Sequence, residues 1–282
     1  MKLPTSTAVA AAALISILPL TPHAAETPKP KASPAESSSS TSASGSSAGT
    51  EELDLKLREA IIKGASMEEI AKLKDPVAKT PQEAIRALKS GNSRFFGGTA
   101  KRPEMSANER RAQILGQTPF AVVLGCSDSR VPIELVYDQS LGDIFAVRVA
   151  GQIVDPGTIG SVEYAVKHLK TKVLVIMGHE GCGAVKAAMS KPEDLKGEPE
   201  NVKYLVDKIA PAVSGIPEIR DPKARMREAV MANVRKQVAL AKENPVVKAA
   251  VAKNELAVVG AFYEISSGQV DFLETDEELR TN

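Results

Sequence analysis

The residues of this chain that could do chemistry lie in two short segments. The sequence has only two cysteines, Cys126 and Cys182, and one of its three histidines, His179, stands three residues before the second cysteine. Two thiolates and one imidazole form a Cys₂His ligand set. Three protein ligands with one exchangeable position are typical of catalytic zinc, whereas structural zinc has four protein ligands. The sequence therefore predicts one Zn²⁺ per subunit, with a position free for water or substrate.

Charged and small residues flank both cysteines. Asp128 and Arg130 follow Cys126 by two and four residues, and a glycine stands on each side of Cys182. An exposed ion pair alone would contribute little to stability, whereas the same pair beside a metal is expected to control its coordination. The glycines allow the backbone to fold tightly around an ion. Cys182 also precedes a predicted short helix, 183–189, whose N-terminus favours a thiolate.

Other interpretations of these residues remain open. In an exported chain the two cysteines could form a disulfide, and Asp128 could be the permanent fourth ligand of a structural zinc ion. His168, at the end of a predicted helix, is expected to interact with the helix dipole rather than with a metal. A disulfide requires neither a histidine near Cys182 nor charged residues beside Cys126, so we favour the catalytic zinc site.

Strands and helices alternate in the part of the chain that must position these residues. Continuous apolar runs predict strands buried on both faces at 120–124, 144–147, 173–177 and 256–260. Helical patterns occupy 158–169, 201–210 and 221–242. This alternation indicates an α/β fold, a mostly parallel β-sheet flanked by helices, with right-handed crossovers. Two segments around the turn at 266–268, namely 261–264 and 270–273, predict a hairpin and an antiparallel edge strand near the C-terminus.

The two ligand segments directly follow two of the predicted strands. Cys126 comes after the first strand, and His179 comes after the third. Ligands of parallel α/β sheets gather at the carboxyl ends of the strands. Both segments are therefore expected to face one crevice.

The N-terminal part of the domain is predicted to be a helical arm. An amphipathic helix is expected at 51–63, and capping boxes at Ser66 and Thr80 open two further helices. Pro81 occupies the first position of the last of them, where its missing N–H costs nothing. We expect this arm to serve packing, for example against a partner subunit.

The first 50 residues differ in composition from the rest. Residues 1–25 combine Lys2, an apolar stretch and a small-residue cleavage point at Ala24 or Ala25, the pattern of a signal peptide. The apolar stretch is shorter than the ~20 residues that span a bilayer; an uncleaved anchor is the alternative. The composition of residues 26–50 predicts a Ser-rich disordered linker. Residues 51–282 are assigned to the catalytic domain, with a core at about 80–273. We expect an exported, periplasmic or secreted protein with no membrane span in the mature chain.

The charge balance excludes one class of partner. The chain has 36 basic and 35 acidic residues, a formal net charge of +1, and it has no tryptophan. Nucleic-acid binders usually carry a basic surplus and surfaces on which bases stack. We therefore expect no nucleic-acid partner.

The two ligand segments resemble the signature motifs of the β-class carbonic anhydrases. Residues 126–130 read CSDSR, residues 179–183 read HEGCG, and the 53-residue spacing from Cys126 to His179 also fits that family. The resemblance covers roughly 80–272 and includes GDIF at 142–145 and EYAV at 163–166. It implies that Cys126, His179 and Cys182 are the zinc ligands.

The resemblance also implies roles for residues around the ligands. Asp128 would bind zinc in a closed state only, or pair with Arg130 and free that position for water, so the two would form a catalytic gate that opens as pH rises. The residues expected to bind substrate are Gln117, Phe145, Tyr164 and Gly183, the last through its backbone N–H. At Ala150 plant-type members carry a larger apolar residue, so a roomier pocket is expected here. The family's dimer builds each active site from two subunits, which implies a homodimer or a higher homo-oligomer.

The activity implied by the resemblance is that of a lyase in carbon utilization. The expected reaction is the zinc-dependent, reversible hydration of CO₂ to bicarbonate and a proton, by attack of zinc-bound hydroxide on CO₂. Two alternatives remain, hydrolysis of COS or CS₂ on the same scaffold and a non-catalytic, zinc-stabilised binding module. Retention of the Asp128–Arg130 pair argues against the second.

Overall fold

A computed structural model describes residues 56, 59–60, 62–65, 77–101 and 113–273 of the chain. The predicted signal peptide, the predicted linker and the helix expected from Ser66 lie outside these residues. Of the helix expected at 51–63, the structure describes helical backbone at Lys56, Glu59, Ala60 and Ile62. All elements discussed below belong to one compact unit, Ser46–Asn282.

The centre of the fold is a five-stranded sheet with the order β2-β1-β3-β4-β5. The strands are β1 (Ala121–Gly125), β2 (Ile144–Arg148), β3 (Val173–His179), β4 (Ala257–Tyr263) and β5 (Val270–Phe272). The first four strands run parallel, and β5 pairs antiparallel with β4. The predicted α/β class, the parallel sheet and the antiparallel edge strand are confirmed.

One boundary predicted within the sheet is wrong. The segments 256–260 and 261–264, expected as separate strands, form the single strand β4, which pairs with β3 from Ala257 to Tyr263. The first half of β4 therefore belongs to the parallel sheet, and its second half also pairs with β5. A partner strand on each side stabilises β4 through the middle of the apolar run, so no turn interrupts it.

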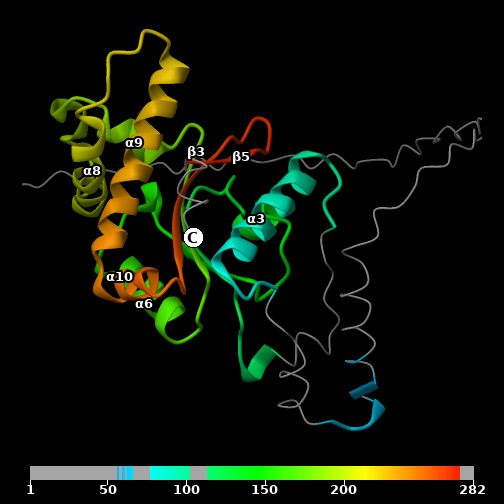
Figure 1. Ribbon diagram of the computed structural model, residues 1–282. Helices are drawn as coiled ribbons and strands as arrows, with labels where there is room; N and C mark the ends of the chain where they lie inside the picture. Colours follow the sequence, from blue (N-terminus) through cyan, green and yellow to red (C-terminus); the bar gives the residue numbers. More distant parts are fainter. Residues whose placement is uncertain (1–55, 57–58, 61, 66–76, 102–112, 274–282) are drawn as a thin grey trace, which may run out of the picture. The chain divides into compact units, whose positions relative to one another are not determined.

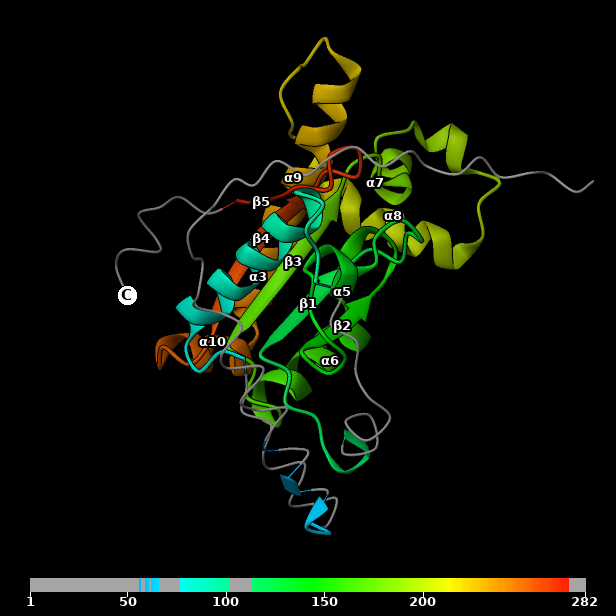
Figure 2. The same cartoon turned by 90° about the vertical axis from the view of Figure 1, so that its right-hand side faces the viewer.

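Helices cover both faces of the sheet (Figures 1 and 2). On one face lie α3 (Pro81–Phe96) and α5 (Ile133–Val136), and on the other lie α6 (Pro156–Lys167), α9 (Pro222–Glu243) and α10 (Pro245–Ala252). Two further helices, α7 (Gly183–Ala188) and α8 (Glu200–Val213), pack on each other and on α9. The helices predicted at 158–169, 201–210 and 221–242 are confirmed with shifted ends. The structure also contains elements that were not predicted, namely α5, α10 and the 3₁₀ turns η1 (Gln113–Leu115), η2 (Ala150–Gln152) and η3 (Pro192–Leu195).

The start of α3 forms as its sequence predicts. The Thr80 hydroxyl accepts a hydrogen bond from the Glu83 N–H at 3.2 Å, and the Glu83 carboxylate accepts one from the Thr80 N–H at 3.2 Å. This reciprocal capping box satisfies two N–H groups that the helix itself cannot pair. Because α3 lies against the sheet with Leu88 fully buried, this last helix of the predicted arm packs on the domain itself.

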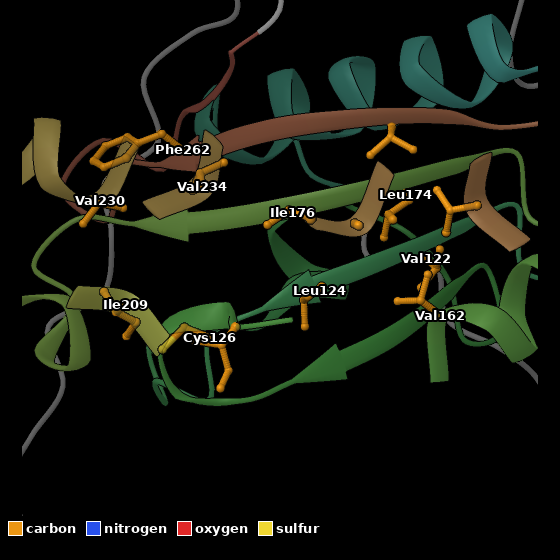
Figure 3. Packing of buried hydrophobic residues seen from close by; sticks show 14 of the residues in the cluster. Val122, Leu124, Cys126, Val162, Leu174, Ile176, Ile209, Val230, Val234 and Phe262 are labelled. Atoms are coloured by element: carbon orange, nitrogen blue, oxygen red, sulfur yellow. The ribbon is translucent and has the colours of Figure 1, made fainter. Parts of the chain in front are cut away.

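The core consists of two apolar clusters separated by the sheet. Val122 and Leu124 of β1 point to α6 and α9, whereas Ala121 and Val123 point to α3 and α5. This alternation follows from the two-residue period of a strand. Figure 3 shows the first cluster, which extends along the sheet to Cys126. The first ligand segment is thus continuous with packed core.

The edge strand β2 departs from the expectation of a strand buried on both faces. Phe145 and Val147 are partly buried against the core, but Ala146 and Arg148 are exposed. Among the described residues, no strand pairs with the outer edge of β2. No helix in the described part of the chain has the length and apolar character needed to cross a membrane.

Candidate metal centre

The three predicted zinc ligands meet at the carboxyl ends of β1 and β3. Cys126 directly follows β1, His179 is the last residue of β3, and Cys182 is the N-cap of α7. Because β1 and β3 are neighbours in the sheet, the two segments lie side by side. The ligand atoms all lie within 4.8 Å of one another, and all three side chains are buried. The structure thus brings together the residues that sequence spacing singled out.

The donor set fits a tetrahedral zinc ion. The two Sγ atoms are 4.0 Å apart, and two thiolates bound to one tetrahedral zinc at ~2.3 Å would be about 3.8 Å apart. Both cysteines are free, so the disulfide alternative is wrong. His179 Nδ1 lies 2.9 Å from the Glu180 carbonyl oxygen, an acceptor, and so carries the proton. The other ring nitrogen, Nε2, is buried with no hydrogen-bond partner and has its lone pair available for a metal.

The two thiols are unequal in charge. The hydrogen bond between the two Sγ atoms, helped by His179 and by the Gly151 N–H, lowers the pKa of the Cys126 thiol to about 4. The same hydrogen bond and burial raise the pKa of the Cys182 thiol, although the N–H groups of Val185 and Ala184 at the start of α7 act in the opposite direction. The protein alone therefore holds one thiolate and one thiol, and a divalent cation between them would favour the second thiolate.

Asp128 is paired with Arg130 rather than directed at the ligands. Arg130 donates from Nε to Oδ1 at 2.9 Å and from Nη2 to Oδ2 at 2.7 Å, and its backbone N–H also donates to Oδ1 at 2.9 Å. These bonds hold the pKa of the Asp128 carboxyl well below its usual range. Asp128 Oδ2 is also 4.0 Å from His179 Nε2. An ionised carboxylate therefore borders the ligand cluster while its two oxygens stay bound to the guanidinium.

Two residues that support the ligands were not predicted from the sequence. Arg148, at the end of β2, donates to the carbonyl oxygen of Cys126 at 3.0 Å and to that of Asp128 at 2.6 Å. The Gly151 N–H points to Cys126 Sγ at 3.4 Å. A Cβ at Gly151 would lie 2.4 Å from Ile209 Cδ1, and φ is +72° there, so glycine is required. Ile209 lies close to Cys126 in Figure 3.

Most predicted substrate residues lie away from the metal ligands of their own chain. Phe145 is opposite Val122 in the sheet register, which places it roughly 10 Å before the carboxyl end of β1. Tyr164, in the last turn of α6, has its ring centroid 6.1 Å from that of Phe145. Gln117 is exposed and precedes β1 by four residues. Gly183 alone adjoins the ligands, as the first residue of α7.

His168 does not join the ligand cluster. It is the C-cap residue of α6, and its ring centroid lies 5.2 Å from that of Tyr164. Among the described residues, the metal-binding group consists of Cys126, His179 and Cys182 alone. The prediction that His168 belongs to a helix end is confirmed.

A parallel sheet whose carboxyl edge holds two cysteines, one histidine and a paired carboxylate defines an α/β metalloenzyme with an exchangeable metal position. The family model described as carbonic anhydrase matches residues 121–270 of the chain. "Carbonic anhydrase 2" of Mycobacterium tuberculosis is 38% identical over 190 residues, which cover 67% of this chain and 91% of that protein. The chain belongs to the carbonic anhydrase family, and its fold and ligands place it in the β class.

Further relatives agree with this assignment. The carbonic anhydrase of Mycolicibacterium smegmatis is 36% identical over 197 residues, covering 68% of this chain and 92% of that protein. A structure reported among two tetrameric β-carbonic anhydrases from Sordaria macrospora superimposes with a TM-score of 0.54 at 28% identity, covering 66% of this chain and 94% of the other. The match to the family model, residues 121–270, contains strands β1 to β4 and all three ligand residues.

Proposed function

We propose that this chain catalyses the reversible hydration of CO₂ to bicarbonate and a proton, with zinc bound by Cys126, His179 and Cys182. The observation that carries this proposal is the buried Cys₂His cluster with an unpartnered His179 Nε2, bordered by an ionised Asp128. Zinc in such a site supplies Lewis acidity and lowers the pKa of a water molecule toward neutrality. Family membership assigns the corresponding lyase activity to this fold.

The protein's own groups orient the reacting molecules. Asp128 is ionised, so its oxygens act only as hydrogen-bond acceptors and can hold the proton of a water beside His179 Nε2. Arg130 keeps this carboxylate turned away from the ligand cluster through two side-chain hydrogen bonds. Arg148 fixes the backbone between Cys126 and Asp128 from the side. The reacting water is therefore positioned by a carboxylate that Arg130 holds through its side chain, on a backbone that Arg148 holds.

Metal analysis and a stopped-flow assay of the purified protein test this function. We expect about one zinc per subunit, and CO₂ hydration that is lost on chelation and restored by Zn²⁺. COS and CS₂ are tested as alternative substrates on the same preparation. Hydrolysis of either without CO₂ hydration would contradict the proposal, and bound zinc with neither activity would indicate a binding module.

A homo-oligomer would complete the substrate pocket. In the described part of the chain no strand pairs with the outer edge of β2, and the exposed ring of Tyr164 lies beside Phe145 of that strand, so a second copy can add to the sheet there. A relative of known structure is described as tetrameric. In a dimer across this edge, Phe145 and Tyr164 of one subunit would line the pocket of the other. Pockets shared in this way depend on assembly for activity.

A substrate pocket shared between subunits predicts a specific effect of replacing Tyr164. Its side chain is 49% exposed in one chain, so Tyr164→Ala should leave the subunit folded while lowering kcat/KM about 10-fold through a lost apolar contact. Tyr204→Ala removes a similarly exposed tyrosine from α8, 41% exposed, and serves as the matched control with wild-type activity. Light scattering should give a dimer or a larger assembly. A fully active monomer would exclude the shared pocket.

Export to the periplasm or the medium is part of the same proposal. It is supported by the basic, apolar and small-residue pattern of residues 1–25 and by the Ser-rich composition of 26–50. Intact-mass measurement of protein from a secreting host should show a mature N-terminus after Ala24 or Ala25. A full-length cytoplasmic product would contradict export.

A further inference from the structure

The turn η2 carries a backbone N–H that donates a hydrogen bond to the sulfur of the ligand Cys126. This turn, Ala150–Gln152, follows β2 and passes beside the first ligand segment. The Gly151 N–H donates to Cys126 Sγ at 3.4 Å, and both residues are buried. A hydrogen bond to a metal thiolate withdraws charge from the sulfur and orients it, so the position of this N–H affects the metal.

The turn has an unfavourable local conformation. Gly151 and Gln152 both have positive φ, +72° and +43°. For a residue with a side chain, such as Gln152, this region costs free energy and persists only where the surroundings impose it. The Gln152 side chain is fully buried, and neither of its amide atoms has a hydrogen-bond partner. The turn therefore needs an anchor from elsewhere in the fold.

Two fully buried amides on α9 supply this anchor. Asn233 Nδ2 donates to the Gly151 carbonyl oxygen at 2.9 Å, and Gln237 Nε2 donates to Asn233 Oδ1 at 3.0 Å. The Val154 N–H in turn donates to Gln237 Oε1 at 2.8 Å. Asn233 and Gln237 are both 0% exposed. They link α9 to the turn on both sides of Gln152.

The orientation of both amides follows from the backbone groups at the two ends. A carbonyl oxygen can only accept, so the Asn233 atom facing Gly151 is Nδ2; an N–H can only donate, so the Gln237 atom facing Val154 is Oε1. Each amide then presents the complementary group to the other. The chain of bonds has one consistent direction and holds Gly151 from its carbonyl side while its N–H faces the sulfur.

We propose that Asn233 and Gln237 are positioning residues of the metal centre. They hold Gly151 in its left-handed conformation so that its N–H donates to Cys126 Sγ, and they thereby set the metal affinity and the electron donation of that thiolate. This inference rests on the proposed function in one respect, namely that Cys126 is a metal ligand. It assigns a role at the metal centre to a helix that supplies none of its ligands.

The test replaces Asn233 with leucine, which has a similar size and no polar atoms. Co²⁺-substituted protein reports the thiolate through its sulfur-to-cobalt charge-transfer band, and competition with a chelator measures Zn²⁺ affinity. We expect Asn233→Leu to move the band to longer wavelength, because an unbonded thiolate is richer in electrons, and to weaken Zn²⁺ binding by about 10- to 100-fold. Both readouts are independent of CO₂ hydration.

Asn92→Leu is the matched control. Asn92 is also a buried asparagine, with three hydrogen bonds to backbone groups of Val136, Gly268 and Val270. It lies on α3, across the sheet from α9. We expect Asn92→Leu to lower thermal stability but to leave the charge-transfer band and the Zn²⁺ affinity unchanged. Equal changes in both variants would show a general effect of destabilisation and overturn the proposal.

Gln237→Met provides a second test of the proposal if Asn233→Leu does not fold. This variant keeps the Asn233–Gly151 bond but removes the group that orients Asn233, so we expect a band shift and a loss of affinity in the same direction and of smaller size. A wild-type band and affinity in either folded variant would exclude the inference. Wild-type protein that binds no zinc would instead contradict the proposed function, so the two failures are distinguishable.

Discussion

Replacement of Cys182 by alanine is expected to remove both the metal and the activity. Cys182 is fully buried, and its Sγ is one of three ligand atoms that lie within 4.8 Å of one another. The remaining pair, Cys126 and His179, would leave zinc with two protein ligands, fewer than the three that catalytic sites provide. We expect zinc content to fall from about one per subunit to near zero, and CO₂ hydration to fall to the uncatalysed rate.

The two histidines in the described part of the chain, His179 and His168, provide a matched comparison for this result. His179→Ala should lose zinc as Cys182→Ala does, because Nε2 is its buried, unpartnered ligand atom. His168→Ala removes an imidazole that stacks near Tyr164 at the end of α6 and should keep full zinc content. Circular dichroism establishes that each variant is folded. Full zinc occupancy in folded Cys182→Ala protein would disprove the ligand assignment.

Arg130→Ala is expected to lower turnover while zinc stays bound. The substitution removes the Nε and Nη2 hydrogen bonds that hold the Asp128 carboxylate at 2.9 and 2.7 Å. Asp128 Oδ2 is already 4.0 Å from His179 Nε2, so the released carboxylate can turn toward a bound cation and occupy the exchangeable position. We expect kcat to fall roughly 10- to 100-fold, the range for residues that orient a metal site.

Three measurements separate this gate from a structural role. Metal analysis should find unchanged zinc in Arg130→Ala, and X-ray absorption should find unchanged sulfur and nitrogen ligands with one added oxygen ligand. Arg130→Lys keeps the positive charge but cannot form the bidentate pair of hydrogen bonds with Asp128, so we expect a kcat between those of the wild type and Arg130→Ala. Arg235→Ala breaks an exposed pair with Glu228 on α9 and should leave kcat at the wild-type value. Wild-type turnover in Arg130→Ala would show that the Asp128–Arg130 pair has a structural role and is not a gate.

Local patterns in the sequence were sufficient for the ligands and for most of the elements. The apolar runs 120–124 and 173–177 predicted β1 and β3, and Cys126 and His179 each come two residues after the end of a run, so the neighbouring positions of β1 and β3 bring these two ligands together. The capping box at Thr80 depends on residues three apart and formed as expected. Such features involve interactions over a few residues, or a general rule for parallel sheets, and therefore need no knowledge of the remaining fold.

The tertiary structure alone decided which strand forms an edge and what supports the metal centre. The apolar run at 144–147 is similar to those of the central strands, yet β2 lies at the outside of the sheet with Ala146 and Arg148 exposed. Asn233 lies 82 residues from Gly151 and Gln237 lies 83 residues from Val154 along the chain. Nothing in the periodicity of α9 distinguishes these amides from surface residues. Their burial and their partners arise only when α9 packs on β3 and β4, because a hydrogen bond between distant segments depends on the packing that brings them together.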